Sequence, residues 1–316
     1  MIARITRILL LLQLAASAAL AVPAIRAWGW SPAAALAFGI GAVLLLRVAI
    51  TRNSFALAAR YRAPLPAAHR LDWRGRQRLF WSEFRATLYA SSWSMPFRAF
   101  RQRAAAAPSG SLPVLLVHGY GCNSGYWVGM SRALAQAGIG HHALDLEPVL
   151  GGIDRYVPLL HRTIEALCAA SGQPRIVVLA HSMGGLAMRA YLRQHGAARI
   201  ARVITLGTPH HGTALANYGI GVNTREMGWR GCAGQGRPSA WLETLAAAES
   251  PAARRLFVSI FSQHDNIVSP QTSSLLADAR NIELGGIGHV ALAFDARVQA
   301  LAIDEIRAAS AAGMPA

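Results

Sequence analysis

The chain has 316 residues and a formal net charge of +16, and all 31 of its basic residues are arginine. This length is enough for one large domain with additional elements, and it excludes a chain too small to bury a core. The three cysteines, Cys122, Cys168 and Cys232, are too few and too scattered for a disulfide framework or a zinc site. We expect buried free thiols, with a single bridge as the alternative.

Two long uncharged stretches occupy the beginning of the chain. Residues 8–25 carry no charge, and after Arg26 the residues 27–46 are again uncharged. A membrane-spanning helix needs about 20 apolar residues, with a lower limit of about 17. We therefore predict a membrane anchor of two transmembrane helices over residues 1–52. The alternative is a secretory signal peptide, which would leave the second stretch unexplained.

A basic segment follows the predicted anchor. Between residues 47 and 103 there are twelve arginines and only two acidic residues, Asp72 and Glu83. Arginines beside a membrane span mark its cytoplasmic side, so we expect both ends of the hairpin and the main domain in the cytoplasm. Residues 53–110 are predicted to form an amphipathic linker, either lying on anionic lipid or packed on the main domain. No nucleic-acid module accompanies the charge, and we expect no nucleic-acid partner.

The remaining residues, 111–316, alternate between short apolar runs and helical patterns. Strands are predicted at 112–119, 175–180, 202–207, 256–262 and 281–286, with a shorter strand inside 141–148. Helices are predicted at 126–137, at 153–170 with Asp154 as its cap, from Met183, and at 296–309. This alternation predicts an α/β fold with a mostly parallel sheet and helices on both faces. The glycine-rich residues 213–250 interrupt it and are predicted to form a cap-like insertion.

The stretch Ala180-His181-Ser182-Met183-Gly184 lies at a predicted junction between strand and helix. A nucleophile elbow, with the usual pattern G-x-S-x-G, needs small residues around its serine because the turn is tight. Here alanine replaces the first glycine. We interpret Ser182 as a nucleophile; the alternative is a serine that only caps the helix.

Three further features lie beyond predicted strands, at the edge where ligands bind in such sheets. The motif HGYG, residues 118–121, ends the first strand of the domain, so the backbone N–H groups of Tyr120 and Met183 are the candidate oxyanion hole. Asp265 and His289 follow later strands, which gives the chain order Ser, Asp, His. We predict His289 as the general base and Asp265 as the acid that orients it.

Other polar residues have weaker claims. Asp145 and Asp154 precede the serine, which disfavours them as the acid, and His264 is expected to orient its loop. His210 and His211 are adjacent but lack a nearby set of carboxylates, so we expect no metal and no cofactor. We expect the substrate pocket, or the support of the catalytic groups, to involve His118, Gly119, His181 and His210.

The motifs HGYGCNSGYW, AHSMGG and TLGTPHHGT, together with HDNIVSP and GIGHVAL, resemble those of the α/β-hydrolase superfamily, and of bacterial lipases within it. The resemblance covers roughly residues 112–305. It implies an α/β-hydrolase fold for these residues and says nothing about the first hundred. The apolar stretches and the arginines, not the resemblance, predict that this fold is preceded by a transmembrane helical hairpin in a bacterial inner membrane. The resemblance also implies hydrolysis of a carboxylic ester through an acyl-enzyme on Ser182, with an acyl ester or lipid as substrate.

Several functions remain open at this stage. The leading hypothesis is a membrane-anchored lipase or esterase. A thioesterase or an acyltransferase would use the same acyl-enzyme. A non-catalytic binding protein could keep the same fold, but it would be expected to have lost part of the catalytic constellation.

Overall fold

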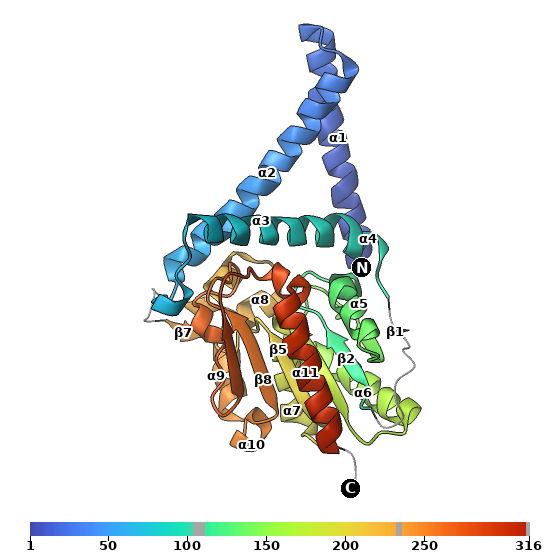
Figure 1. Ribbon diagram of the computed structural model, residues 1–316, viewed down its shortest axis with the longest axis vertical. Coiled ribbons are helices and arrows are strands. Elements are labelled where there is room, and N and C mark those ends of the chain that lie inside the picture. The colour runs from blue at the N-terminus through green and yellow to red at the C-terminus, as the bar shows by residue number, and fades with distance from the viewer. Residues whose placement is uncertain (101, 104–110, 232–235, 314–316) are drawn as a thin grey trace.

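The computed structural model describes residues 1–100, 102–103, 111–231 and 236–313, and Cys232 lies outside them. Its first two helices, α1 (Ile2–Trp28) and α2 (Pro32–Tyr61), form a hairpin that projects from the rest of the molecule (Figure 1). Both are long and apolar enough to cross a membrane. Their aliphatic side chains are largely exposed, for example Leu11 at 65% and Leu45 at 69%.

Small residues bring the two helices of the hairpin together. A Cβ on Gly39 would overlap the backbone carbonyl of Ser17, so glycine is required at this crossing. Below the crossing the helices diverge toward the main domain (Figure 1). Helix α2 continues without a break past residue 52, the predicted end of the anchor. The appearance of charged residues does not end a helix, and α2 stops shortly before Pro64.

Helix α3 (Trp73–Tyr89) crosses the gap at the base of the hairpin (Figure 1). Asp72 begins it, because its carboxylate accepts a hydrogen bond of 2.7 Å from the N–H of Gly75. One side of α3 contacts the main domain and another contacts α2, while Trp73 and Trp81 stay exposed. A five-residue π-helical segment, Ala90–Ser94, and the short α4 (Met95–Phe97) follow.

The main domain is built on a seven-stranded sheet with the order β1-β3-β2-β4-β5-β8-β9. All neighbouring strands are parallel except β1, which pairs antiparallel at one edge. The strands are β1 (Gln102–Arg103), β2 (Val114–Val117), β3 (His141–Leu144), β4 (Ile176–His181), β5 (Ile200–Leu206), β8 (Phe257–Ser262) and β9 (Arg280–Leu284). Every residue of β2, β4 and β8 is buried, as expected when helices cover both faces.

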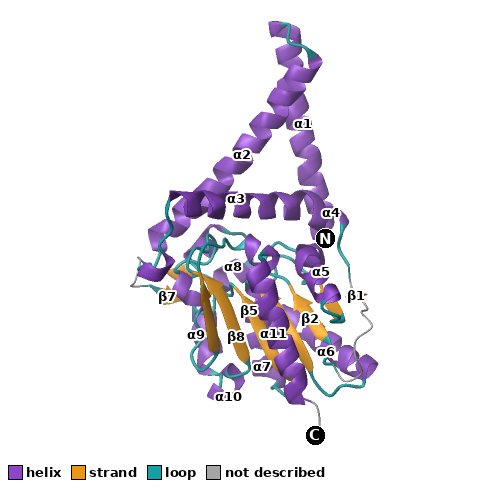
Figure 2. Ribbon diagram, in the orientation of Figure 1, coloured by secondary structure: helices purple, strands orange, loops and turns teal. Residues whose placement is uncertain are grey.

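Helices lie on both faces of this sheet (Figure 2). They are α5 (Val128–Gln136), α6 (Val157–Ser171), α7 (Met183–His195) and α11 (Ala296–Gly313), while the four-residue α10 (Pro251–Arg254) precedes β8 at the lower end of the molecule in the figure. The predicted alternation of strands and helices, and the predicted fold class, are confirmed. The cap of the helix predicted at 153–170 was wrong: Asp154 instead accepts hydrogen bonds from Arg193 at 2.5 Å and from Trp241 at 3.0 Å.

The segment predicted as an insertion holds α8 (Val222–Glu226), the two-stranded ribbon β6 (Trp229–Arg230) and β7 (Arg237–Pro238), and α9 (Ala240–Ala247). Its described residues add no strand to the main sheet. The hydroxyl of Tyr120 donates a 2.8 Å hydrogen bond to the carbonyl of Ile220 and so connects this segment to the loop after β2. Cys122 and Cys168 are free thiols.

Candidate active site

Ser182 lies between the end of β4 and the first residue of α7. Its backbone has φ 54° and ψ −126°, a conformation that non-glycine residues rarely adopt and that the nucleophile of a tight elbow requires. Two hydrogen bonds hold this strained turn: the Ser182 N–H donates to Leu206 at 2.9 Å, and the hydroxyl of Thr208 donates to the Ser182 carbonyl at 2.8 Å. The Ser182 hydroxyl makes no capping bond to α7.

The glycines beside Ser182 allow close backbone approach. A Cβ on Gly184 would lie 2.5 Å from the carbonyl oxygen of Val117, at the end of β2. A Cβ on Gly185 would overlap the side chain of Thr208, and one on Gly119 would lie 2.7 Å from the Ser182 Cβ. A side chain at any of these positions would therefore push α7 or the β2 loop away from the serine.

The candidate oxyanion donors come from two sides of this turn. Met183 is the first residue of α7, so its backbone N–H belongs to the unpaired first turn of a helix. Tyr120 belongs to the loop after β2, and Gly119 in that loop lies against Ser182. These positions fit a pair of donors for a negative charge forming beside the serine, with the helix dipole favouring the same charge.

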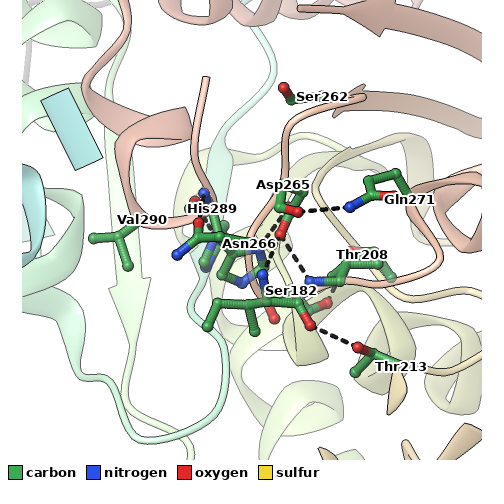
Figure 3. A network of polar contacts seen from close by, with 12 residues as sticks. Ser182, Thr208, Thr213, Ser262, Asp265, Asn266, Gln271, His289 and Val290 are labelled. Atoms are coloured by element: carbon green, nitrogen blue, oxygen red, sulfur yellow. Dashed lines mark hydrogen bonds and ion pairs between the residues drawn. The ribbon is translucent and has the colours of Figure 1, made fainter. Parts of the chain in front are cut away.

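Asp265 and His289 form a buried pair across the loops after β8 and β9. The distance from His289 Nδ1 to Asp265 Oδ2 is 2.7 Å, and the residues are 4% and 2% exposed. The other carboxylate oxygen, Oδ1, accepts from the N–H groups of Ile267 and Val268 at 2.8 and 2.7 Å. Figure 3 shows Asp265 held between its neighbours, with Gln271 donating to its backbone carbonyl. The carboxylate is thereby fixed in one orientation.

The electrostatics of this pair suit a general base. Burial alone lowers the pKa of His289, but the charge of Asp265 and its hydrogen bond outweigh burial and leave that pKa above its ordinary value. Because Nδ1 donates to Asp265, the neutral ring presents Nε2 as its free acceptor. Gly207, at the end of β5, lies against both partners: a Cβ there would be 3.0 Å from Asp265 Oδ2 and 3.3 Å from His289 Nδ1.

His118 and His181 form hydrogen bonds that hold the loops around the candidate site. His181 Nε2 lies 3.2 Å from the carbonyl of His289, and the two rings are 4.5 Å apart. Burial lowers the pKa of His181 well below its usual value, so the ring is neutral and donates. His118 Nε2 accepts from the N–H of Leu146 at 3.0 Å, which joins the loops after β2 and β3. Burial lowers the pKa of His118 as well.

The hydrogen bonds of His210 go to residues outside the candidate triad. Its Nε2 lies 3.3 Å from the hydroxyl of Thr205, and its carbonyl accepts from Arg189 at 2.6 Å. None of the hydrogen bonds found in the described residues joins it to Ser182, Asp265 or His289. Among the same residues, no group of three or more metal-ligating side chains comes together.

Two residues that the sequence did not single out, Glu83 and Asn266, hold the loop that contains His289. Glu83 on α3 is buried, and its carboxylate accepts from the N–H of Val290 at 3.1 Å and of Ala291 at 2.9 Å, directly after His289. Asn266 Oδ1 accepts from the N–H of His289 itself at 2.9 Å. In the sequence, Glu83 stands out only as one of the two acidic residues of the basic segment 47–103. No feature of the sequence marks Asn266 as a residue that supports the site.

Comparison with known proteins agrees with this architecture. Residues 113–228 match the family model described as the alpha/beta hydrolase fold. Triacylglycerol lipases from Pseudarthrobacter phenanthrenivorans and Burkholderia plantarii are each 29% identical over 114 residues. The match covers 34% of this chain and 35% and 32% of those two relatives, so it spans about a third of their length.

Solved structures extend the likeness over about two thirds of the chain. The mature lipase BlEst2 of Bacillus licheniformis superimposes with a TM-score of 0.56 and 15% identity, covering 66% of this chain and 97% of the lipase. Lipase B of Aspergillus fumigatus has a TM-score of 0.54 and 20% identity, covering 64% of this chain and 54% of that one. The chain is therefore an α/β-hydrolase-fold protein, similar to lipases.

Proposed function

We propose that the protein is a membrane-anchored serine hydrolase that cleaves carboxylic esters through a Ser182–Asp265–His289 triad. The observation that carries the proposal is the buried Asp265–His289 pair, 2.7 Å apart, at the same edge of the sheet as a serine in strained elbow geometry. An ordinary helix cap needs neither the strain nor the pair. The likeness to lipases supports an ester as substrate.

The reaction follows from these positions. His289 Nε2 takes the proton of the Ser182 hydroxyl while its oxygen attacks the ester carbonyl. The N–H groups of Tyr120 and Met183 donate to the resulting oxyanion. Collapse breaks the ester bond, and His289 returns its proton to the leaving alcohol. Water, activated by the same histidine, then hydrolyses the acyl-enzyme and restores Ser182.

The hairpin of α1 and α2 serves as the anchor in this proposal. Its exposed aliphatic surface suits lipid, and the arginines after it favour a cytoplasmic main domain. An enzyme held at a bilayer meets substrates dissolved there without a diffusive search through water. Acyl esters of membrane lipids are therefore the substrate class that the arrangement favours.

Hydrolysis of p-nitrophenyl esters from acetyl to palmitoyl tests the proposal. Replacing the nucleophile in Ser182→Ala should lower kcat by about 10⁴-fold or more. Ser171→Ala, which alters an exposed serine on α6, is the matched control and should keep full activity. Equal activity of wild type and Ser182→Ala would refute Ser182 as the nucleophile. Inactivity of the wild type on every ester would refute ester hydrolysis.

A further inference from the structure

A cavity of about 660 Å³ lies between the C-terminal end of α2, residues 62–72, α3 and the loop that precedes Asp265. Its polar lining consists of Arg62, Arg70, Arg76 and His264, and its remaining lining residues are apolar. No acidic side chain lines it. We call it the Arg62 pocket. Its volume falls within the range of about 300–1,000 Å³ that small-molecule sites occupy.

The three arginines of the Arg62 pocket have no carboxylate partner among the described residues, although they lie together in one pocket. In the described part of the main domain, six guanidinium groups pair with carboxylates, as in Arg189–Glu249 at 2.7 Å and Arg199–Glu165 at 2.9 Å. No ion pair of this kind is formed by the pocket arginines among the described residues. Positive charge thus accumulates there without compensation.

The surroundings of Arg62 in the pocket are unfavourable for its charge. Its Nε is buried and has no hydrogen-bond partner in the described structure. Burial, and then the nearby charge of Arg76, lower the pKa of the Arg62 guanidinium. A buried, unpaired N–H donor beside a like charge is unfavourable by itself, and an anion placed between the arginines would relieve both effects.

His264 adds a neutral donor to the same pocket. Its Nδ1 accepts a 3.0 Å hydrogen bond from the N–H of Gly286, so the proton of the ring resides on Nε2. Burial and then the charge of Arg62 lower the pKa of His264 to about 4, which keeps the ring uncharged at neutral pH. An anion would therefore meet guanidinium groups and one imidazole N–H.

The apolar part of the pocket indicates a ligand that also carries hydrocarbon. Phe55 of α2 and Phe80 of α3 line it with ring centroids 6.2 Å apart, and Leu79 lies beside them. A site for a free inorganic anion needs no such wall. Phe55 belongs to the helix that we assign to the bilayer, so the pocket opens where that helix leaves the membrane.

We propose that the Arg62 pocket binds the phosphate headgroup of an anionic phospholipid, with the beginning of an acyl chain against Phe55, Leu79 and Phe80. Guanidinium groups bind phosphate oxygens through paired hydrogen bonds, which matches three arginines without acidic partners. The identification of the ligand as a lipid rests on the proposed membrane anchor, but not on the ester chemistry. Since His264 directly precedes Asp265, the bound lipid would contact the loop of the catalytic acid.

Isothermal titration of the full-length Ser182→Ala protein in uncharged detergent tests the proposal, because this variant cannot hydrolyse the probe. The probes are dihexanoyl phosphatidylglycerol, dihexanoyl phosphatidylcholine and inorganic phosphate. The anionic lipid should bind more tightly than the other two. The double change Arg62→Gln and Arg76→Gln should weaken its binding by about tenfold or more, because charged hydrogen bonds are lost.

The matched control changes Arg74→Gln and Arg78→Gln, two exposed arginines of α3 that do not line the pocket. This control removes the same charge and should weaken binding by less than about twofold, as expected for screened surface charges. Equal losses in the two double variants, or equal binding of phosphatidylcholine, would overturn the proposal.

Two further results keep the test decisive. If inorganic phosphate binds as tightly as the anionic lipid and shows the same loss in the double variant, the anion site stands and the lipid is overturned as its ligand. If Arg62→Gln with Arg76→Gln lowers the melting temperature enough to prevent titration, the exposed Arg70→Gln is used instead. It should weaken the binding of the anionic lipid, and unchanged binding would count against the site.

Discussion

The two halves of the proposed triad are held by different parts of the molecule. Ser182 is fixed by the sheet itself, through the end of β5 and the loop after β2. The loops of Asp265 and His289 are instead bound from outside by the first hundred residues. Glu83 of α3 holds the residues after His289, and Ser54 of α2 accepts a 2.8 Å hydrogen bond from Asn266.

The N-terminal helices therefore hold the loops of Asp265 and His289 in addition to forming the hairpin. A second bond from the same region, from the Ser269 hydroxyl to the carbonyl of Ala58 at 2.7 Å, ties α2 to the loop of the catalytic acid. A simple tether would need no buried contact with the catalytic loops. We therefore expect changes in α2 and α3 to affect turnover, while the serine turn depends on the sheet alone.

The largest effect should come from the pair itself. Asp265→Asn keeps the shape of the side chain but removes the charge that orients and stabilises the His289 ring. We expect kcat for p-nitrophenyl butyrate to fall by about 10⁴-fold with little change in KM. Asp278→Asn, at a surface residue paired with Arg254, is the control and should have wild-type kinetics. A loss below tenfold would show that Asp265 is not the acid.

The next effect should arise from α3. Glu83→Ala leaves the partly buried N–H of Val290 and the buried N–H of Ala291 without an acceptor, at about 1–3 kcal/mol for an unsatisfied buried group. We expect kcat/KM to fall by about 10- to 100-fold at temperatures well below the melting temperature. Gln77→Ala, exposed on the same helix, should have no effect. Partial recovery in Glu83→Gln, which restores an acceptor, would separate positioning from loss of fold.

A smaller effect is expected from α2. Ser54→Ala removes the acceptor of Asn266 but leaves the bond from Asn266 to the His289 N–H in place. A single hydrogen bond contributes about 0.5–1.5 kcal/mol, so kcat should fall by about two- to tenfold. Ser82→Ala, whose hydroxyl donates within α3 to the carbonyl of Leu79, is the control. If Ser54→Ala and Ser82→Ala behave alike, α2 does not support the acid loop.

The smallest expected effect is a shift in the pH dependence of kcat/KM between the wild type and Asp265→Asn. His289 must be neutral to act as a base, so kcat/KM should rise with pH through an apparent pKa above the ordinary value of about 6.5. Asp265→Asn removes the charge that does most to raise the pKa of His289, so burial is then opposed chiefly by the charge of Glu83 and the residual activity should rise at lower pH than in the wild type. A rate profile of the two proteins measures this shift, and a shift to higher pH would contradict the assignment.

Much of the sheet and its motifs could be predicted from the sequence, because both depend on local pattern. Strands buried on both faces appear as continuous apolar runs such as 176–180, and the residues needed for an elbow lie within five positions of Ser182. The meeting of Asp265 and His289 followed from the shared edge of parallel strands. These features need no knowledge of distant partners.

The support of the catalytic loops could not be predicted in the same way. Glu83 binds backbone N–H groups more than 200 positions away, and any residue at Val290 or Ala291 would supply them. Asp154 failed as a cap for a related reason, since the helix there begins with a 3-10 turn and its carboxylate meets Arg193. Such contacts depend on how separate elements pack, which periodicity does not record.

The rate at which a fluorophosphonate probe labels the protein tests the central claim most directly, with the adduct located by peptide mass spectrometry. We predict an adduct on Ser182 in both the wild type and Glu83→Ala, formed about tenfold or more slowly in the variant because its histidine loop is displaced. An adduct on another residue would contradict Ser182 as the nucleophile. Equal labelling rates would contradict the claim that the N-terminal helices hold the catalytic histidine in place.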